Sequence, residues 1–88
     1  MVRRRVVVTG RVQGVFFRDS CRQEAERYGV AGWAANTPDG TVEIELEGPP
    51  DAVQAVVDWA HHGPETAEVR SVAVYEAPES GETGFTVR

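Results

Sequence analysis

The sequence contains few of the features that staple or anchor a chain. Its single cysteine, Cys21, excludes an internal disulfide and is typical of a protein from a reducing compartment. The apolar run Val6 to Val8 is shorter than a signal-peptide core and far shorter than the roughly 18 apolar residues of a membrane span. With 88 residues, 41% of them hydrophobic, the chain has the size and composition of one globular domain. We therefore predict a single domain over residues 1–88, in the cytoplasm and without a membrane partner.

Lysine is also absent, so arginine supplies all nine basic side chains. The formal net charge of −5 argues against a nucleic-acid partner, and the predicted strands lack the interleaved aromatic residues typical of RNA-binding sheets. The charge is uneven, because residues 1–27 contain seven arginines and sum to +4, whereas residues 28–88 sum to −9. We therefore expect any anion-binding site to lie in the first third of the chain.

The spacing of apolar residues predicts two helices and several strands. Apolar side chains recur at helical intervals after Gly14 and predict a helix that Gly29 ends, with a buried face made of Phe17, Cys21, Ala25 and Tyr28. A second helix is expected to begin at Pro49 to Asp51 and to end before Gly63, with a buried stripe made of Ala52, Val53, Val56, Val57 and Ala60. The predicted strands span residues 5–12, 31–36, 42–47, 69–75 and 85–88.

This order of elements predicts an α+β fold of the ferredoxin-like type. The order is β-α-β-β-α-β with a short extra C-terminal strand, and in such an α/β sandwich two helices cover one face of a mostly antiparallel sheet. In the strand over residues 42–47, apolar residues alternate with Glu43, Glu45 and Glu47. We expect these glutamates to be solvated and to discourage edge-to-edge pairing of the sheet.

The segment from Gly10 to Arg18 is the strongest candidate for binding an anion. It runs from a strand end to a helix start, where successive backbone N–H groups and the helix dipole favour negative charge. Arg18 lies in the first helical turn, from which a guanidinium can grip two oxygens of the same anion. The segment lacks the Gly-Lys-Ser/Thr ending of a nucleotide P-loop, so ATP or GTP is not indicated. Taken alone, it is more typical of a plain strand-to-helix connection with a solvated arginine.

A second segment, residues 32–43, places Asn36 at a strand end before the turn Thr37-Pro38-Asp39-Gly40. A side-chain amide can both accept from and donate to a water molecule without becoming charged. An isolated asparagine at this position is most often a turn former.

Together the two segments resemble the two signature motifs of the acylphosphatase family. The first matches over residues 10–18, and the second matches at Gly32, Trp33, Asn36, Gly40, Val42 and Gly48. Residues 63–69 and 84–88 also look like the family, so the resemblance covers nearly the whole chain.

The resemblance implies an enzyme that hydrolyses the carboxyl–phosphate bond of a small acyl phosphate, giving a carboxylate and inorganic phosphate. It implies no metal and no other cofactor. It assigns phosphate binding to Arg18 and to backbone amides at Gly14, Val15, Phe16, Phe17 and Arg18. Asn36 is assigned to orient the attacking water for direct in-line attack, and the Thr37 hydroxyl to support Asn36 or the leaving-group side. Because nothing in the sequence requires a partner chain, we expect a monomer.

Two other patterns suggest chemistry that we do not expect. Cys21 and Arg27 have the C-x5-R spacing of protein tyrosine phosphatases, but the residues between them are strong helix formers and Cys21 falls on the apolar helix face. His61 and His62 are adjacent, so on a helix their side chains diverge, and no further ligand accompanies them. We expect Cys21 in the core and the histidines as complements to a helix C-terminus.

Two rival functions stay open at the level of the sequence. A small ferredoxin-like regulatory domain could sense an anion without turnover, in which case ligand binding would occur without hydrolysis. The chain is also similar to the acylphosphatase-like domain at the start of a hydrogenase-maturation carbamoyltransferase, a kinship that a preference for carbamoyl phosphate would favour. We expect the independent enzyme, because the chain contains one domain and nothing attached to it.

Overall fold

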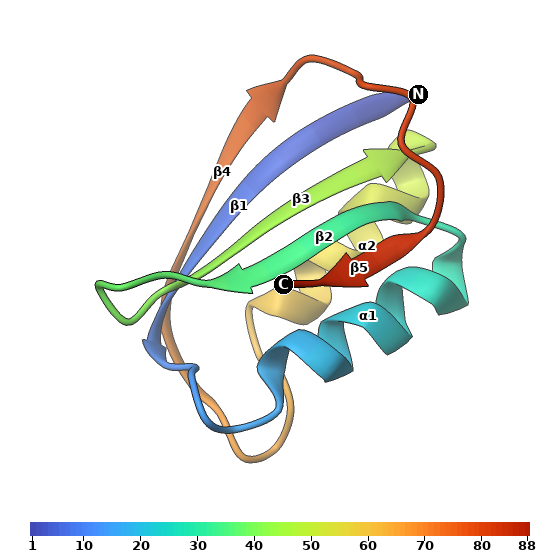
Figure 1. Cartoon of the computed structure of the whole chain (residues 1–88). Coiled ribbons are helices and arrows are strands. Elements are labelled where there is room, and N and C mark those ends of the chain that lie inside the picture. The colour runs from blue at the N-terminus through green and yellow to red at the C-terminus, as the bar shows by residue number, and fades with distance from the viewer.

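A computed structural model describes all residues, 1–88, as five strands and two helices. Along the chain they are β1 (Val2–Arg11), α1 (Phe17–Tyr28), β2 (Ala31–Asn36), β3 (Val42–Gly48), α2 (Pro50–Ala60), β4 (Glu68–Ala77) and β5 (Phe85–Val87). The strands form one sheet in the order β4-β1-β3-β2-β5, and both helices lie on the same face of it (Figure 1). All neighbouring strands are antiparallel except β2 and β5, which are parallel. The predicted ferredoxin-like α+β fold is confirmed.

The core lies between the helices and the covered face of the sheet. Seventeen buried hydrophobic residues form one continuous cluster. Val6 and Val8 on β1 are opposite Ile44 and Val42 on β3, and all four side chains are fully buried. The helices complete the cluster with Phe17, Cys21, Ala25, Val53, Val56, Val57 and Ala60. A single cluster of this kind fixes both helices relative to the ends of β1 and β2.

The prediction that Tyr28 belongs to the buried face of α1 is wrong. Tyr28 is the last residue of the helix, directly before the left-handed Gly29, and its side chain is 41% exposed. Its ring lies under the Arg27 guanidinium, 5.6 Å from the ring centroid. The helical period of buried residues holds as far as Ala25; α1 ends at Tyr28, and the chain enters the core again at Val30.

The prediction of a solvated glutamate row at a sheet edge is also wrong. β3 is the central strand of the sheet, so its side chains cannot guard an edge. β1 begins at Val2 rather than at residue 5, which places Arg3 directly opposite Glu47. The Arg3 guanidinium is buried and forms ion pairs with Glu45 at 2.6 Å, Glu47 at 2.8 Å and Glu82 at 2.9 Å. The outer face of the sheet thus carries a packed ionic cluster, which a period-two pattern cannot distinguish from a solvated row.

The same cluster holds the chain between β4 and β5. This segment passes from one edge of the sheet to the other around the end where the N-terminus lies (Figure 1). The Glu47 carboxylate accepts the backbone N–H groups of Ser80 and Gly81, both at 2.9 Å. Ser80 and Arg3, the latter through its side chain, lower the pKa of Glu47 to about 2. The ionic cluster thereby determines where β5 begins.

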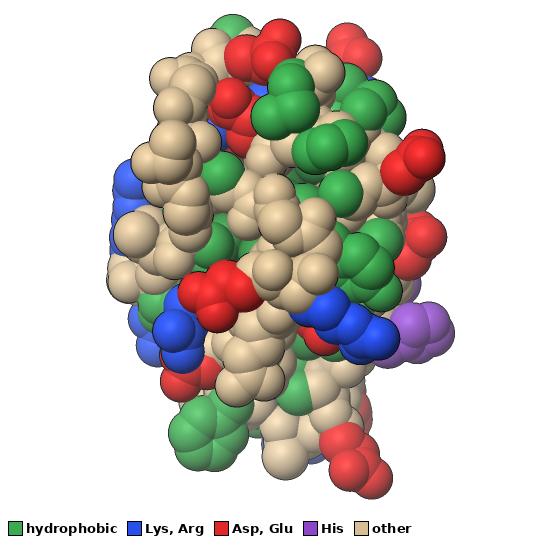
Figure 2. Space-filling view, turned by 90° about the vertical axis from the view of Figure 1, so that its right-hand side faces the viewer, with side chains coloured by type: hydrophobic (Ala, Val, Ile, Leu, Met, Phe, Trp, Pro, Cys, Tyr) green, Lys and Arg blue, Asp and Glu red, His purple; other side chains and the backbone are tan.

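The surface shows little of the charge segregation seen in the sequence. On the face of the molecule in Figure 2, acidic and basic side chains are interspersed with hydrophobic ones. Within the first 27 residues, five arginines form ion pairs with carboxylates: Arg3, Arg5, Arg11, Arg22 and Arg27.

None of the helices combines the length and the apolar character that crossing a membrane requires.

Replacing Glu47 by Gln is expected to lower the thermal unfolding midpoint at pH 7. The midpoint of the variant should also fall less than that of the wild type as the pH is lowered. The pKa of Glu47 is lower in the folded chain than its ordinary value of 4.5, so its contribution is complete above that pH and is lost as the pH falls towards 2. The measurement is the unfolding midpoint by circular dichroism between pH 7 and pH 2. Glu79→Gln, on the same segment and exposed, is the control and should change neither quantity. Equal acid sensitivity in wild type and Glu47→Gln would contradict this account.

Candidate active site

A cavity of about 270 Å³ opens where β1 and β2 end and α1 begins. It is lined by Val12, Gly14, Phe16, Phe17, Arg18, Asp19, Asn36 and Val87. The predicted site residues Gly14, Phe16, Phe17, Arg18 and Asn36 are therefore brought together around one cavity. Val15 and Thr37 do not line it, whereas Asp19 and Val87 do.

The loop at the base of the cavity exposes a row of unpaired backbone donors. Gly14 and Phe16 both have left-handed backbones, with φ of 73° and 64°. The first hydrogen bond of α1 runs from the Ser20 N–H to the Phe16 carbonyl, and none of the N–H groups of residues 14–19 donates to another backbone group. Unpaired donors at a helix N-terminus, together with the helix dipole, bind anions. The loop therefore has the geometry that anion binding requires.

Arg18 is the one cationic side chain that lines the cavity. It extends from the first turn of α1 and, unlike five other arginines of this part of the chain, forms no ion pair with an aspartate or glutamate. Its Nη1 donates to a main-chain oxygen of Arg88, the last residue of the sequence, at 2.6 Å. Of the seven arginines in the first 27 residues, Arg18 alone brings its positive charge to the cavity.

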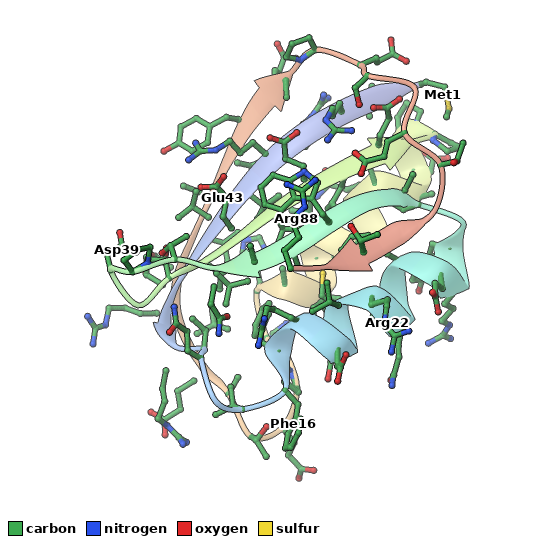
Figure 3. The ribbon with its side chains drawn as sticks, viewed as in Figure 1. Met1, Phe16, Arg22, Asp39, Glu43 and Arg88 are labelled. Atoms are coloured by element: carbon green, nitrogen blue, oxygen red, sulfur yellow. The ribbon has the colours of Figure 1, made fainter.

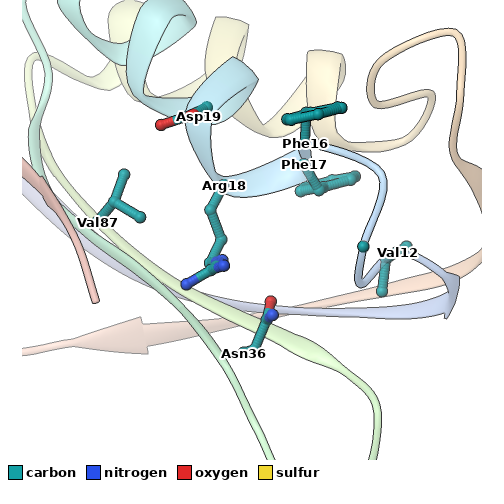
Figure 4. A pocket seen from close by; sticks show the side chains of 8 residues that line it. Val12, Phe16, Phe17, Arg18, Asp19, Asn36 and Val87 are labelled. Atoms are coloured by element: carbon teal, nitrogen blue, oxygen red, sulfur yellow. The ribbon is translucent and has the colours of Figure 1, made fainter.

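Asn36 faces Arg18 across the cavity. It is the last residue of β2 and is exposed, and its side chain points towards the Arg18 guanidinium from the opposite wall (Figure 4). The strand directs it there, because side chains alternate along β2 and Asn36 follows Gly32 and Ala34 on the face of the sheet that the helices cover. A cation, a row of amide donors and a neutral amide thus surround one space of small-molecule size.

A family model described as Acylphosphatase matches residues 4–87 of the chain. Curated proteins named acylphosphatase are 58% identical in Rubrobacter xylanophilus, over 96% of this chain and 77% of that protein, and 54% identical in Gloeobacter violaceus, over 98% and 92%. The chain belongs to the acylphosphatase family. The crystal structure of acylphosphatase from Bacillus subtilis superimposes with a TM-score of 0.97 at 38% identity, over 100% of this chain and 99% of that one.

A further solved structure shares the fold alone. Full-length HypF, crystallised in its phosphate- and nucleotide-bound form, gives a TM-score of 0.92 at 24% identity over 99% of this chain but 12% of its own. The acylphosphatase fold is thus found both as a chain of this length and within a much longer protein.

Gln13 lies in the loop between β1 and α1 and has a role that the sequence did not reveal. Its side-chain Nε2 donates to the carbonyl oxygens of Thr37 and Thr41, at 2.8 and 2.9 Å. Gln13 therefore connects the loop between β1 and α1 to the turn that follows Asn36. Its position in the first motif, between Val12 and Gly14, marks Gln13 as a candidate functional residue. Periodicity cannot predict which groups its side chain binds.

Thr37 lies in that turn and not in the cavity wall. Its hydroxyl bonds to the Asp39 carboxylate and lies 2.7 Å from the Thr41 hydroxyl. The hydrogen bonds from Thr37 and Thr41 hold the pKa of Asp39 below its usual range. The geometry thus gives Thr37 a place in shaping the turn that carries Asn36.

Core residues hold the loop between β1 and α1 in place. Phe17 is 1% exposed and its ring packs on Trp59 of α2, with centroids 5.1 Å apart. A side chain at Gly63 would meet the Phe17 ring at 2.5 Å, so the loop after α2 closes tightly over it. The Thr66 hydroxyl donates to the Val15 carbonyl at 2.7 Å. The start of α1 is thereby held from two sides.

Cys21 and the histidines lie outside the site. Cys21 is fully buried in the core, as predicted, and burial raises the pKa of its thiol to about 12, whereas a phosphatase nucleophile requires a thiolate. His61 Nδ1 lies 3.0 Å from the Val57 carbonyl in the last turn of α2. No group of three or more His, Cys, Asp or Glu side chains is arranged to hold a metal ion.

Replacing Gln13 by Met is expected to lower kcat/KM for an acyl phosphate about ten-fold, because Asn36 loses its fixed position relative to the loop. The free energy of unfolding should fall by only about 1–2 kcal/mol for the two hydrogen bonds. The measurements are steady-state kinetics with benzoyl phosphate and urea unfolding. Gln54→Met removes an exposed hydrogen bond to Asp58 on α2 and is the matched control, with unchanged kinetics expected. A folded Gln13→Met with wild-type kcat/KM would refute the positioning role.

Proposed function

We propose that this chain hydrolyses acyl phosphates to a carboxylate and inorganic phosphate, with Arg18 and Asn36 as its catalytic residues. The observation that carries the proposal is the single cavity in which unpaired amides, an arginine without an Asp or Glu partner and a facing asparagine meet. Membership of the acylphosphatase family supports the same reaction class.

The phosphoryl group is proposed to bind between the loop amides and the Arg18 guanidinium. The amides from Gly14 to Arg18, including those of Val15, Phe16 and Phe17, supply fixed donors, and the guanidinium supplies charge and a bidentate grip. Phosphoryl transfer requires mainly positioning and stabilisation of negative charge on the equatorial oxygens. Donors that are already oriented provide this without reorganising during the reaction.

The leaving group explains how the reaction proceeds without a general acid. The product carboxylate has a conjugate-acid pKa of about 4, so it departs without being protonated. This chemistry also requires no metal or other cofactor, and we propose that none takes part.

Asn36 is proposed to orient the attacking water. Its amide accepts one hydrogen bond from the water and donates another, but it cannot take up the proton as a strong base. We therefore assign the water's proton to an oxygen of the substrate's own phosphate. The attack is direct and in line, with no phosphoenzyme, and Thr37 supports Asn36 by shaping the turn.

The remaining assignments are proposals that rest on composition. We propose one acylphosphatase domain over residues 1–88, acting as a monomer on a small substrate without a nucleic-acid partner. A cytoplasmic location follows from the single, buried cysteine and stays a prediction.

Hydrolysis of benzoyl phosphate in the presence of a chelator tests the proposal. Arg18→Ala and Asn36→Ala are each expected to lose at least about 100-fold in kcat, since removal of one preorganised donor typically costs roughly 3 kcal/mol. Arg27→Ala is the matched control, because Arg27 lies on the same helix but pairs with Glu24 at 3.9 Å, and neither residue lines the cavity. Circular dichroism checks that each variant is folded.

Other outcomes separate the rival functions. Phosphate binding by a folded wild type without turnover would indicate an anion-sensing module and overturn the proposal. Loss of activity with chelator would contradict metal independence, and a covalent phosphoprotein trapped during turnover would contradict direct attack. A strong preference for carbamoyl phosphate over other acyl phosphates would favour the carbamoyltransferase-type domain.

A further inference from the structure

Phe16 is an exposed aromatic side chain in a strained backbone position at the edge of the cavity. Its side chain is 74% exposed, the largest exposure of any aromatic residue described for the chain. It is also the only non-glycine residue with a positive φ, at 64°. A left-handed backbone disfavours residues that carry a Cβ, and an exposed phenyl ring gains nothing from the core. Neither feature contributes to the stability of the fold.

The two adjacent phenylalanines are used in opposite ways. Phe17 enters the core and packs on Trp59, whereas Phe16 remains at the tip of the loop between β1 and α1, away from the core (Figure 3). Phe16 caps α1 without a side-chain hydrogen bond, so the ring serves no capping function. Strained residues that the fold does not require concentrate at ligand sites.

The geometry of the reaction indicates which part of the substrate contacts the Phe16 ring. In the close view of the cavity, Asn36 on β2 lies below the Arg18 guanidinium, and Phe16 at the start of α1 lies above and to the right of it (Figure 4). In an in-line displacement the leaving group departs on the side opposite to the attacking water. A water held at Asn36 therefore directs the acyl group towards the side where Phe16 lies. Val12, Phe17 and Val87 are the other apolar residues that line the cavity.

We propose that Phe16 is the specificity-determining residue for the acyl group and selects acyl phosphates with an aryl or similarly apolar acyl part over acetyl phosphate. This inference rests on the proposed function, because the acyl group is placed by the position of the water. The ring contacts the uncharged part of the substrate, while the amide of the same residue serves the phosphate. One residue thus belongs to both halves of the site.

The test compares two substrates in three variants. The readout is the ratio of kcat/KM for benzoyl phosphate to kcat/KM for acetyl phosphate, which cancels effects common to both substrates. Phe16→Asn removes the ring but tolerates a left-handed backbone, and Phe16→Tyr keeps the ring. Tyr28→Ser removes another exposed ring, far along α1 from the cavity, and is the matched control.

We expect the ratio to fall about three- to ten-fold in Phe16→Asn, as the loss of one aromatic contact implies, and to be retained in Phe16→Tyr and Tyr28→Ser. An unchanged ratio in a Phe16→Asn variant that still hydrolyses both substrates would overturn the acyl-selection role and leave the proposed function intact. A wild type inactive on both substrates would overturn the proposed function, and this inference with it.

Discussion

Unsatisfied backbone N–H groups at the start of α1 are the constraint around which the molecule is arranged. A helix cannot satisfy its first donors internally, and here the preceding loop adds more of them, so that residues 14–19 present a row without backbone acceptors. An anion that fills this space satisfies the donors and is favoured by the helix dipole. The left-handed backbones of Gly14 and Phe16 are the local condition for the arrangement.

The rest of the fold holds this loop and brings two side chains to it. Phe17 fixes the helix start to α2 through Trp59, and Thr66 holds the loop from the other side. Gln13 joins the loop to the turn after β2, which sets the distance between the amides and Asn36. At the opposite end of the sheet, the buried Arg3 cluster determines the course of residues 78–84 and hence the position of β5. β5 in turn supplies Val87 to the cavity, and a main-chain oxygen of Arg88, which follows it, accepts a hydrogen bond from Arg18.

Much of this could be predicted from sequence because it depends on local pattern. The helical period over Phe17, Cys21 and Ala25, the proline at the start of α2 and the alternation in β3 each follow from rules that act within a few residues. The two motifs place Arg18 and Asn36 at an element start and an element end, and the fold then brings them to one cavity.

What could not be predicted depends on contacts between distant residues. The outward side chains of β3 show the same alternation whether they meet water or a buried arginine, and Arg3 is 44 positions away from Glu47. Gln13 likewise acts on carbonyl groups 24 and 28 positions along the chain. Tyr28 continues the helical period in sequence, but it is the last residue of α1 and its exposed ring lies against the Arg27 guanidinium. The helical period places Phe17 in the core, but it does not predict the left-handed backbone of Phe16 beside the cavity.

The central claim is that the backbone amides of residues 14–19 form the phosphate site. The most direct test is a titration of the ¹⁵N-labelled chain with inorganic phosphate, followed by amide chemical shifts. The account predicts that the largest shifts fall on the amides of residues 14–19 and on the Asn36 side-chain amide, with saturation at a single affinity. Shifts centred instead on the exposed arginines Arg22 and Arg27, with the amides of residues 14–19 unmoved, would contradict it.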